Sequence, residues 1–220
     1  MTVLGIGQRT TSYQTPAYVQ TDNFSGGSGT VTPTFPSSTT SGNLIIVGIA
    51  IEDATSTVSS VVDSKGNTYQ AATSISTTYG GNRRVQIYYA YNITGGSSHT
   101  VTVTISGGST RVNAHINEYS GCESASDPLD VTSSGSAGDD PTSGSANTSL
   151  DKSLIYSFVA AAGTLTAGAG FTERGEYVFN IYSATEDQVQ TTAGSISASW
   201  TTSGTAQGVC QMACFKPKLV

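Results

Sequence analysis

Short runs in which apolar and polar residues alternate are the feature that most limits how this chain can fold. Residues 84–93 place an apolar side chain at every second position, and residues 99–106 and 111–119 repeat the pattern. Glycine pairs at 95–96 and 107–108 separate these runs. A period of two is typical of strands, and strands divided by closely spaced turn residues indicate an antiparallel meander or Greek key.

The most apolar run of the chain, LIIVGIAI at residues 44–51, predicts a different kind of strand. It is short and rich in β-branched side chains, which favours a central strand buried on both faces. Residues 58–62 predict a short strand, and residues 63–67 predict a tight turn in which Gly66 takes a positive φ. We expect residues 68–76 to return as the hairpin partner of that strand.

The second half of the chain begins with its longest polar stretch, residues 122–146, which we predict to be a surface excursion with Val131 paired to a sheet edge. No segment has an apolar period of 3.6 residues, and composition does not change along the chain. These features predict one all-β domain at residues 17–220, a single jelly-roll-like antiparallel β-sandwich. Further strands are expected at residues 150–161, 171–174, 178–190, 195–201 and 205–215.

Charge and hydropathy exclude several classes of function. Only 11% of the residues are charged and the net charge is −6, whereas a nucleic-acid partner requires a basic stripe. No stretch approaches the roughly 18 apolar residues of a membrane span. Residues 1–7 lack the charged and apolar regions of a signal peptide. We nevertheless expect an extracellular, cell-surface or virion location, either through assembly inside a cell, as for phage proteins, or through an export signal outside this sequence.

The N-terminal residues 1–16 are predicted to form an extended arm. Val3, Leu4, Ile6 and Tyr13 are its candidate interface residues, because an extended segment can add to the sheet edge of a neighbouring subunit. Such a head-to-tail contact between identical chains gives a filament when the rotation does not close. A frayed terminus is the alternative interpretation.

Five short segments of this chain occur in a characteristic order. They are GNLIIV at 42–47, VDSKGNTY at 62–69, IYYA at 87–90, EYSG at 118–121 and CFKP at 214–217. With these segments the sequence resembles a family of uncharacterised bacterial and phage-associated jelly-roll β-sandwich domains, and it is similar to protomers of extracellular helical filaments that are linked through an N-terminal segment. The resemblance covers residue 17 to the C-terminus and implies a structural role with no established catalytic residues.

The sequence contains no motif that indicates catalysis. His99 and His115 lie within alternating runs, and no nucleophile elbow, zinc-protease motif or phosphate loop occurs. His115 and Glu118 fall on opposite faces of one strand, and we expect Glu118 to be a buried carboxylate bonded to a neighbouring strand or loop. The prediction is therefore a non-enzymatic protein without a cofactor. A glycan-acting enzyme remains a distant alternative, based on carboxylates at Glu52–Asp53, Asp139–Asp140, Glu173, Glu176 and Glu186–Asp187.

Other ligand sites are weighed against plainer interpretations. If a metal binds, calcium suits the aspartates of the polar stretch, although a solvated acidic loop is favoured. Aromatic side chains could bind glycans, although core packing is common for them in β proteins. The three cysteines, Cys122, Cys210 and Cys214, are predicted to be buried thiols, with a disulfide from Cys122 left open. The candidates are Asp127, Asp130, Asp139 and Asp140 for calcium, Tyr88, Tyr177, Tyr182 and Trp200 for glycans, and Asn23, Asn92 and Asn147 for glycosylation.

Taken as a whole, the sequence predicts a self-assembling structural protein, a protomer of an extracellular filament or phage particle. The alternative is a carbohydrate-binding or adhesion module that uses exposed Tyr and Trp side chains.

Overall fold

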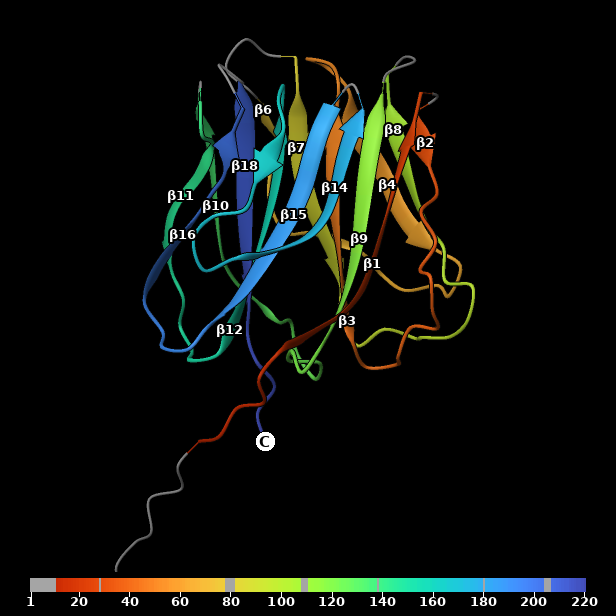
Figure 1. The fold of residues 1–220 in the computed structure, drawn as a ribbon. Helices are drawn as coiled ribbons and strands as arrows, with labels where there is room; N and C mark the ends of the chain where they lie inside the picture. Colours follow the sequence, from red (N-terminus) through yellow and green to blue (C-terminus); the bar gives the residue numbers. More distant parts are fainter. Residues whose placement is uncertain are drawn as a thin grey trace, which may run out of the picture.

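The computed structural model describes residues 11–27, 29–77, 82–107, 111–137, 139–179, 181–203 and 207–220. Within these ranges the chain has strands and no helix, and every strand pair is antiparallel (Figure 1). The predicted all-β antiparallel sandwich is confirmed. The strands group into two halves of the chain, each with one large sheet and smaller strands that cover its outer face.

In the first half, the large sheet has the order β1-β9-β3-β7-β5, with β6 also pairing with β7, and the small sheet has the order β2-β8-β4. The run at 44–51 is the middle strand and is buried along its whole length, as predicted. The strands are β1 (Ala17–Gly26), β2 (Thr30–Val31), β3 (Leu44–Ile51), β4 (Thr57–Asp63), β5 (Gln70–Ala71), β6 (Ser76–Thr77), β7 (Arg84–Ala90), β8 (Val101–Ser106) and β9 (Val112–Ser120).

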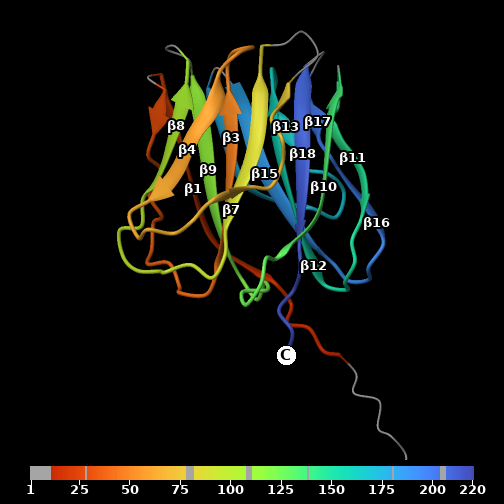
Figure 2. The ribbon, with the colours of Figure 1, turned by 180° about the vertical axis from the view of Figure 1, so that it is seen from behind.

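In the second half, the large sheet has the order β10-β18-β12-β15-β14, and two strand pairs, β11-β16 and β13-β17, cover its outer face. The small sheets of the two halves lie on opposite sides of the molecule (Figure 2). The strands are β10 (Leu129–Ala137), β11 (Thr142–Asn147), β12 (Ser153–Ala161), β13 (Leu165–Thr166), β14 (Thr172–Phe179), β15 (Ile181–Gln190), β16 (Ser195–Ser199), β17 (Thr201–Thr202) and β18 (Gly208–Phe215).

The two halves repeat one strand order. Going along the chain, β1, β2, β3, β4, β7 and β9 of the first half take the same places as β10, β11, β12, β13, β15 and β18 of the second. The segment of β16 and β17 takes the place of β8. The chain is therefore built as two sandwiches of equal topology, although no change of composition separates them.

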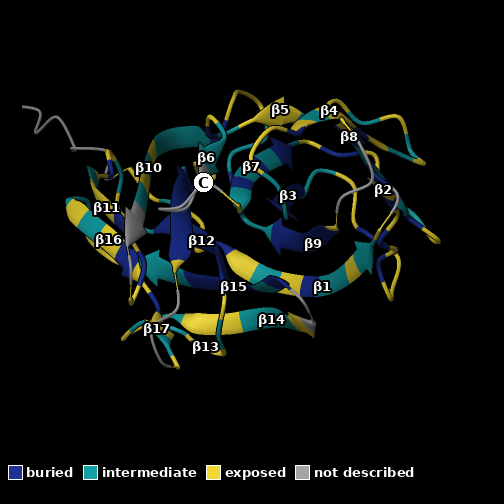
Figure 3. Cartoon of the chain, turned by 90° about the horizontal axis from the view of Figure 1, so that it is seen from above, coloured by how far each residue is buried: buried dark blue, intermediate teal, exposed yellow. Residues whose placement is uncertain are grey.

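Three apolar cores hold these layers together. One lies between the two sheets of the first half, and another lies beneath the outer strands of the second half. The third, which we call the central core, joins the faces of the two large sheets and includes Leu44, Ile87, Phe158 and Phe215. The inner strands β3, β9, β12 and β18 are therefore buried on both faces, whereas the edge strands β1 and β14 carry exposed residues (Figure 3). Burial of this extent is the main stabilising contribution to such a fold.

The central core is closed by a side chain of one half that enters a gap in the other. Leu44 of β3 and Leu154 of β12 hold equivalent places in the two halves, because each pairs with the last aromatic residue of the neighbouring strand, β9 or β18. Positions 48 and 158, each four residues further along, therefore correspond as well. One position is Gly48 and the other is Phe158. A Cβ atom on Gly48 would lie 2.5 Å from the Phe158 ring. The two halves thus pack into each other because one has glycine and the other phenylalanine at equivalent positions.

Two predictions about local structure are wrong. Residues 68–76 are not the hairpin partner of β4, because β5 and β6 within this segment pair with β7. Residues 122–146 are more than a surface excursion, because they contain β10, which pairs with β18, and most of β11. The pairing predicted for Val131 is confirmed, since it pairs with Cys214 of β18. The polar sequence of β10 and β11 gave no apolar alternation, and pairing with strands far along the chain decides their structure.

Candidate functional site

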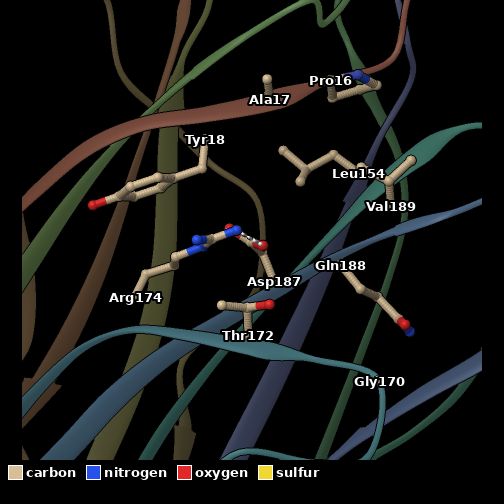
Figure 4. Close-up of a pocket in the computed structure, with 10 residues that line it drawn as sticks. All are labelled: Pro16, Ala17, Tyr18, Leu154, Gly170, Thr172, Arg174, Asp187, Gln188 and Val189. Carbon is tan, nitrogen blue, oxygen red and sulfur yellow. Dashed lines mark hydrogen bonds and ion pairs between the residues drawn. The ribbon is translucent and has the colours of Figure 1, made fainter.

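The edge strands of the two large sheets, β1 and β14, run side by side (Figure 3). A cleft opens between the beginnings of these two strands (Figure 4). Its volume is about 460 Å³, which lies within the usual range of small-molecule sites. The cleft is lined by Pro16, Ala17, Tyr18, Leu154, Gly170, Thr172, Arg174, Asp187, Gln188 and Val189.

Two β-bulges shape the walls of this cleft. The pairing of β1 with β9 shifts between Tyr18 and Gln20, and the pairing of β14 with β15 shifts between Glu173 and Gly175. A bulge bends its strand and redirects a side chain. Tyr18 adjoins the first irregularity, and Arg174 is the extra residue of the second. Both side chains meet in the cleft.

Arg174 is held by a bidentate ion pair and an aromatic ring. Its Nε and Nη2 atoms donate to the Asp187 carboxylate at 2.8 and 2.9 Å, and its guanidinium carbon lies 4.3 Å from the centroid of the Tyr18 ring (Figure 4). The Tyr119 hydroxyl donates to the same carboxylate at 2.8 Å. The bonds to Asp187 raise the pKa of Arg174, and burial raises the pKa of Tyr18. The guanidinium is therefore charged and rigid, with its charge balanced by Asp187.

Behind the cleft, a row of buried polar side chains runs along β9. Asn113, His115, Asn117 and Tyr119 all face the second large sheet, whereas the residues between them face the first-half core. His115 Nε2 lies 2.9 Å from the Ser183 hydroxyl, and burial lowers the pKa of His115 to about 3. Among the described groups, its Nδ1 has no hydrogen-bond partner. The imidazole is therefore neutral and has one unpaired ring nitrogen.

Glu186 faces the opposite way, into the second-half core. Burial raises its pKa to about 8, although the amide of Gly168 donates to Oε2 at 2.8 Å. Glu173 is its cross-strand partner on β14 and adds to the shift. Because Glu186 is fully buried, this carboxyl is protonated at neutral pH and does not reach the cleft. The pair therefore does not form an accessible acid–base site of the glycosidase kind.

The two termini of the described chain meet at one end of the molecule (Figure 1). Tyr13 forms a β-bridge with Leu219, the amide of Gln14 donates to Lys218 O at 2.8 Å, and the amide of Val220 donates to Ser12 O at 2.9 Å. Lys152 Nζ donates to the Tyr13 carbonyl at 2.7 Å. The candidate interface residues Val3, Leu4 and Ile6 lie outside the described residues.

The predicted glycan-binding aromatics are dispersed, and the prediction is wrong for one of them. Trp200 is 1% exposed and donates from Nε1 to the Ser157 hydroxyl at 3.0 Å, so it is a core residue. Tyr88 and Tyr182 are half-buried against the two outer cores, and Tyr177 is half-buried on β14. The cleft aromatic, Tyr18, was missed because nothing in the sequence next to it indicates Arg174.

The four calcium candidates do not gather into a site. Asp127 accepts the Tyr89 hydroxyl, Asp130 accepts the amide and hydroxyl of Ser149, and Asp140 accepts the amide of Thr202. Asp139 is exposed. In the part of the chain that the structure describes, no three His, Cys, Asp or Glu side chains are grouped as metal ligands. Asp127, Asp130 and Asp140 accept hydrogen bonds from neighbouring segments instead.

The remaining predicted residues have clear environments. Glu118 is fully buried and accepts hydrogen bonds from Gln20 and Asn43 side chains and from the Thr40 amide at 2.6–2.7 Å, as predicted. His99 is equally buried and bonds to Asp63 in the 63–67 turn, where Gly66 has the predicted positive φ of 77°. All three cysteines are buried free thiols. Of the glycosylation candidates, Asn92 and Asn147 are exposed and Asn23 is half-buried.

The fold and cleft together define an all-β protein made of two fused antiparallel sandwiches with a polar cleft at their joint edge. No protein-family model matches this chain. No curated protein and no solved structure matches it either. In the described ranges there is no helix with the length and hydropathy needed to cross a membrane.

Proposed function

We propose that this chain is a non-enzymatic structural protomer that polymerises head to tail through its N-terminal arm, residues 1–16. Residues 12–14 stay paired with the body of their own copy, and the residues before them add as a strand to the next copy. Its setting would be an extracellular filament or a phage particle. The resemblance of residues 17–220 to filament-forming jelly-roll domains motivates the proposal.

The observation that carries the proposal is the way residues 12–14 are fixed. Their backbone is bonded to residues 218–220, and the Lys152 ammonium holds the Tyr13 carbonyl. Residues 11–16 therefore leave the body in an extended conformation at a defined place. A frayed terminus would not require these bonds, whereas a linker between subunits must have a fixed origin.

The length of the N-terminal segment suits such a link. Ten residues precede Thr11, and an extended chain of this length spans about 35 Å at most. A compact domain of this size has a radius of gyration of about 17 Å, so the segment is long enough to lie along a sheet edge of a neighbouring subunit. Residues 2–7 are uncharged and alternate loosely, which suits addition to a sheet edge.

Receiving edges are present on the body. β1, β4 and β14 each lie at the end of a sheet and carry exposed apolar side chains, namely Val19 and Phe24, Val62, and Val178. Soluble proteins ordinarily protect edges with charge or coverage. An exposed apolar edge is the kind of surface to which an arriving strand adds.

The test is electron microscopy and size-exclusion chromatography of the full chain beside a variant that lacks residues 1–10. We expect regular polymers from the full chain and a folded monomer from the truncated one. As a matched control, Ser12→Ala should leave assembly intact, since the carbonyl of residue 12 and not its side chain accepts the hydrogen bond from the Val220 amide. A full chain that remains a monomer of 22.5 kDa contradicts the proposal.

A further inference from the structure

We propose that the cleft between β1 and β14 binds a neutral sugar ring, with Tyr18 and Arg174 as its recognition residues. The inference rests on the geometry of the cleft and not on polymerisation, although its walls, β1 and β14, are also candidate receiving edges for the arm. It also differs from the aromatic residues that the sequence suggested.

The first argument is a comparison between the two halves. Tyr18 pairs with Tyr119 in β9, and Leu129 pairs with Phe215 in β18, so these two edge positions correspond. The pairing of β10 shifts just after Leu129, as that of β1 does after Tyr18. The bulge therefore belongs to the repeated fold, but the side chains around it differ.

At the counterpart position Leu129 packs against the central core, as Tyr18 does. Beside it the Tyr89 hydroxyl donates to the Asp127 carboxylate at 2.8 Å, and the same carboxylate accepts the Leu129 amide. Among the described residues, the same topology is thus completed there by a hydrogen bond from a neutral hydroxyl and not by an ion pair. A largely buried ion pair adds little stability compared with apolar packing, because both charges lose hydration. The Arg174–Asp187 pair is therefore not required by the fold, which points to a role in recognition.

The second argument concerns the hydrogen-bonding groups that remain available. A guanidinium has five N–H groups, and the bonds to Asp187 use two of those of Arg174. The other three are free to donate to a ligand. The Thr172 hydroxyl and the Gln188 amide, which can each donate and accept, line the same cleft. Hydroxyl groups of a sugar need this mixture of donors and acceptors.

The cleft also offers an apolar surface. The Tyr18 ring, Leu154 and Val189 supply carbon atoms beside the polar groups (Figure 4). A sugar ring has an apolar C–H face and a hydroxyl edge, so it matches a site that combines aromatic and polar side chains. Ring stacking and the bidentate pair fix the guanidinium before binding, which reduces the entropy lost on association.

The charge of the cleft selects among sugars. The positive charge of Arg174 is already balanced by Asp187, so the lining carries no net charge. An acidic sugar would gain no unpaired cation and would meet the Asp187 carboxylate. We therefore expect neutral hexoses and their disaccharides to bind in preference to uronic acids.

The experiment is saturation-transfer difference NMR on the sugar protons, which detects binding to monomers and to polymers of the full chain. A panel of neutral hexoses, N-acetylhexosamines and their disaccharides is compared with glucuronic and galacturonic acid. Neutral sugars should show saturation transfer. Tyr18→Leu, which introduces the residue of the other half, should weaken their binding at least about tenfold while the melting temperature stays close to wild type.

Thr172→Val provides a second variant in case Tyr18→Leu perturbs the fold, because Thr172 is exposed. It should also weaken binding, whereas Thr142→Val, an exposed threonine of β11, should not. Three outcomes overturn the inference: no saturation transfer to any neutral sugar, equal binding by the wild type and the two cleft variants, or binding of uronic acids alone.

Discussion

Gly48 shows how one residue determines whether the two halves can close on each other. Its lack of a side chain makes room for the Phe158 ring from the opposite sheet. Because both residues lie in strands that are buried on both faces, neither can move aside easily.

We expect Gly48→Ala to lower the free energy of unfolding by about 1–3 kcal/mol, the usual effect of overpacking a core. The measurement is the midpoint and slope of urea unfolding. Gly27→Ala is the matched control, since a Cβ there meets no atom within 4 Å, and it should change stability by less than about 0.5 kcal/mol. An unchanged midpoint for Gly48→Ala would show that the halves do not interlock as described.

Glu186 is a residue whose ionisation in the unfolded chain opposes folding at neutral pH. Its pKa is about 8 in the folded protein and 4.5 in its ordinary state, so the unfolded chain releases this proton first as the pH rises. Folding stability should therefore fall between about pH 4.5 and 8, by up to about 1.4 kcal/mol per pH unit. Glu186→Gln, which keeps the protonated shape, should remove this decline.

Urea unfolding of the wild type and Glu186→Gln at pH 5 and pH 8 tests this expectation. The variant should be the more stable protein at pH 8, and the difference should shrink at pH 5. Glu173→Gln is the control for the exposed member of the pair, and its effect should be much smaller. Equal pH dependence in wild type and Glu186→Gln would contradict the assignment.

At the scale of the element, the segment of residues 11–16 is the one whose fixation matters most to the proposed function. Lys152 has a positive φ of 60° and reaches from the β11–β12 turn to the Tyr13 carbonyl. Lys152→Met keeps the length of the side chain but removes the donor.

We expect Lys152→Met to raise the rate of proteolytic cleavage near residues 11–16 severalfold, while the loss in overall stability stays within about 3 kcal/mol, the upper value for one hydrogen bond to a charged group. Limited proteolysis with mass spectrometry measures the cleavage rate. Lys65→Met, which removes a similar side chain-to-backbone bond at another turn, should not change cleavage there. If both variants are cut alike, the Lys152 bond does not fix the arm.

At the same scale, sequence periodicity located most strands of the first half but not their partners. The alternation of residues 84–90, 101–106 and 112–119 agrees with β7, β8 and β9. β10 and β11 were missed because Ser, Thr and Gly form them without an apolar face. Their pairing with β18 and β16 involves residues more than 45 positions away, and local patterns do not contain that information.

For the whole molecule, the central core makes the two halves dependent on each other. Each large sheet has one face covered by its own small strands, and among the described residues the other face is covered by the partner half. Separation would expose Leu44, Ile87, Phe158 and Phe215 together.

We therefore expect residues 11–121 expressed alone to lack stable tertiary structure. Two measurements test this. Binding of a dye to exposed apolar surface should be strong, and the amide NMR signals should be poorly dispersed. Co-expression with residues 122–220 should return dye binding and signal dispersion to values close to those of the full chain. A well-dispersed spectrum of residues 11–121 alone would show that this half folds independently.

The sequence by itself determined the all-β class, the fully buried strand at 44–51, the turn at 63–67 and the buried environments of Glu118 and the cysteines. Each follows from local chemistry, namely residue periodicity, glycine conformation and the cost of leaving a carboxylate unpaired. Only the tertiary structure decided that the chain repeats one topology, that Trp200 is buried, and that Asn113 and His115 face a second sheet. It also brought Tyr18 to Arg174 and Asp187 across more than 150 residues of chain. The physical reason is that a strand has two faces, and what covers each face depends on the packing of distant segments rather than on the neighbours in sequence.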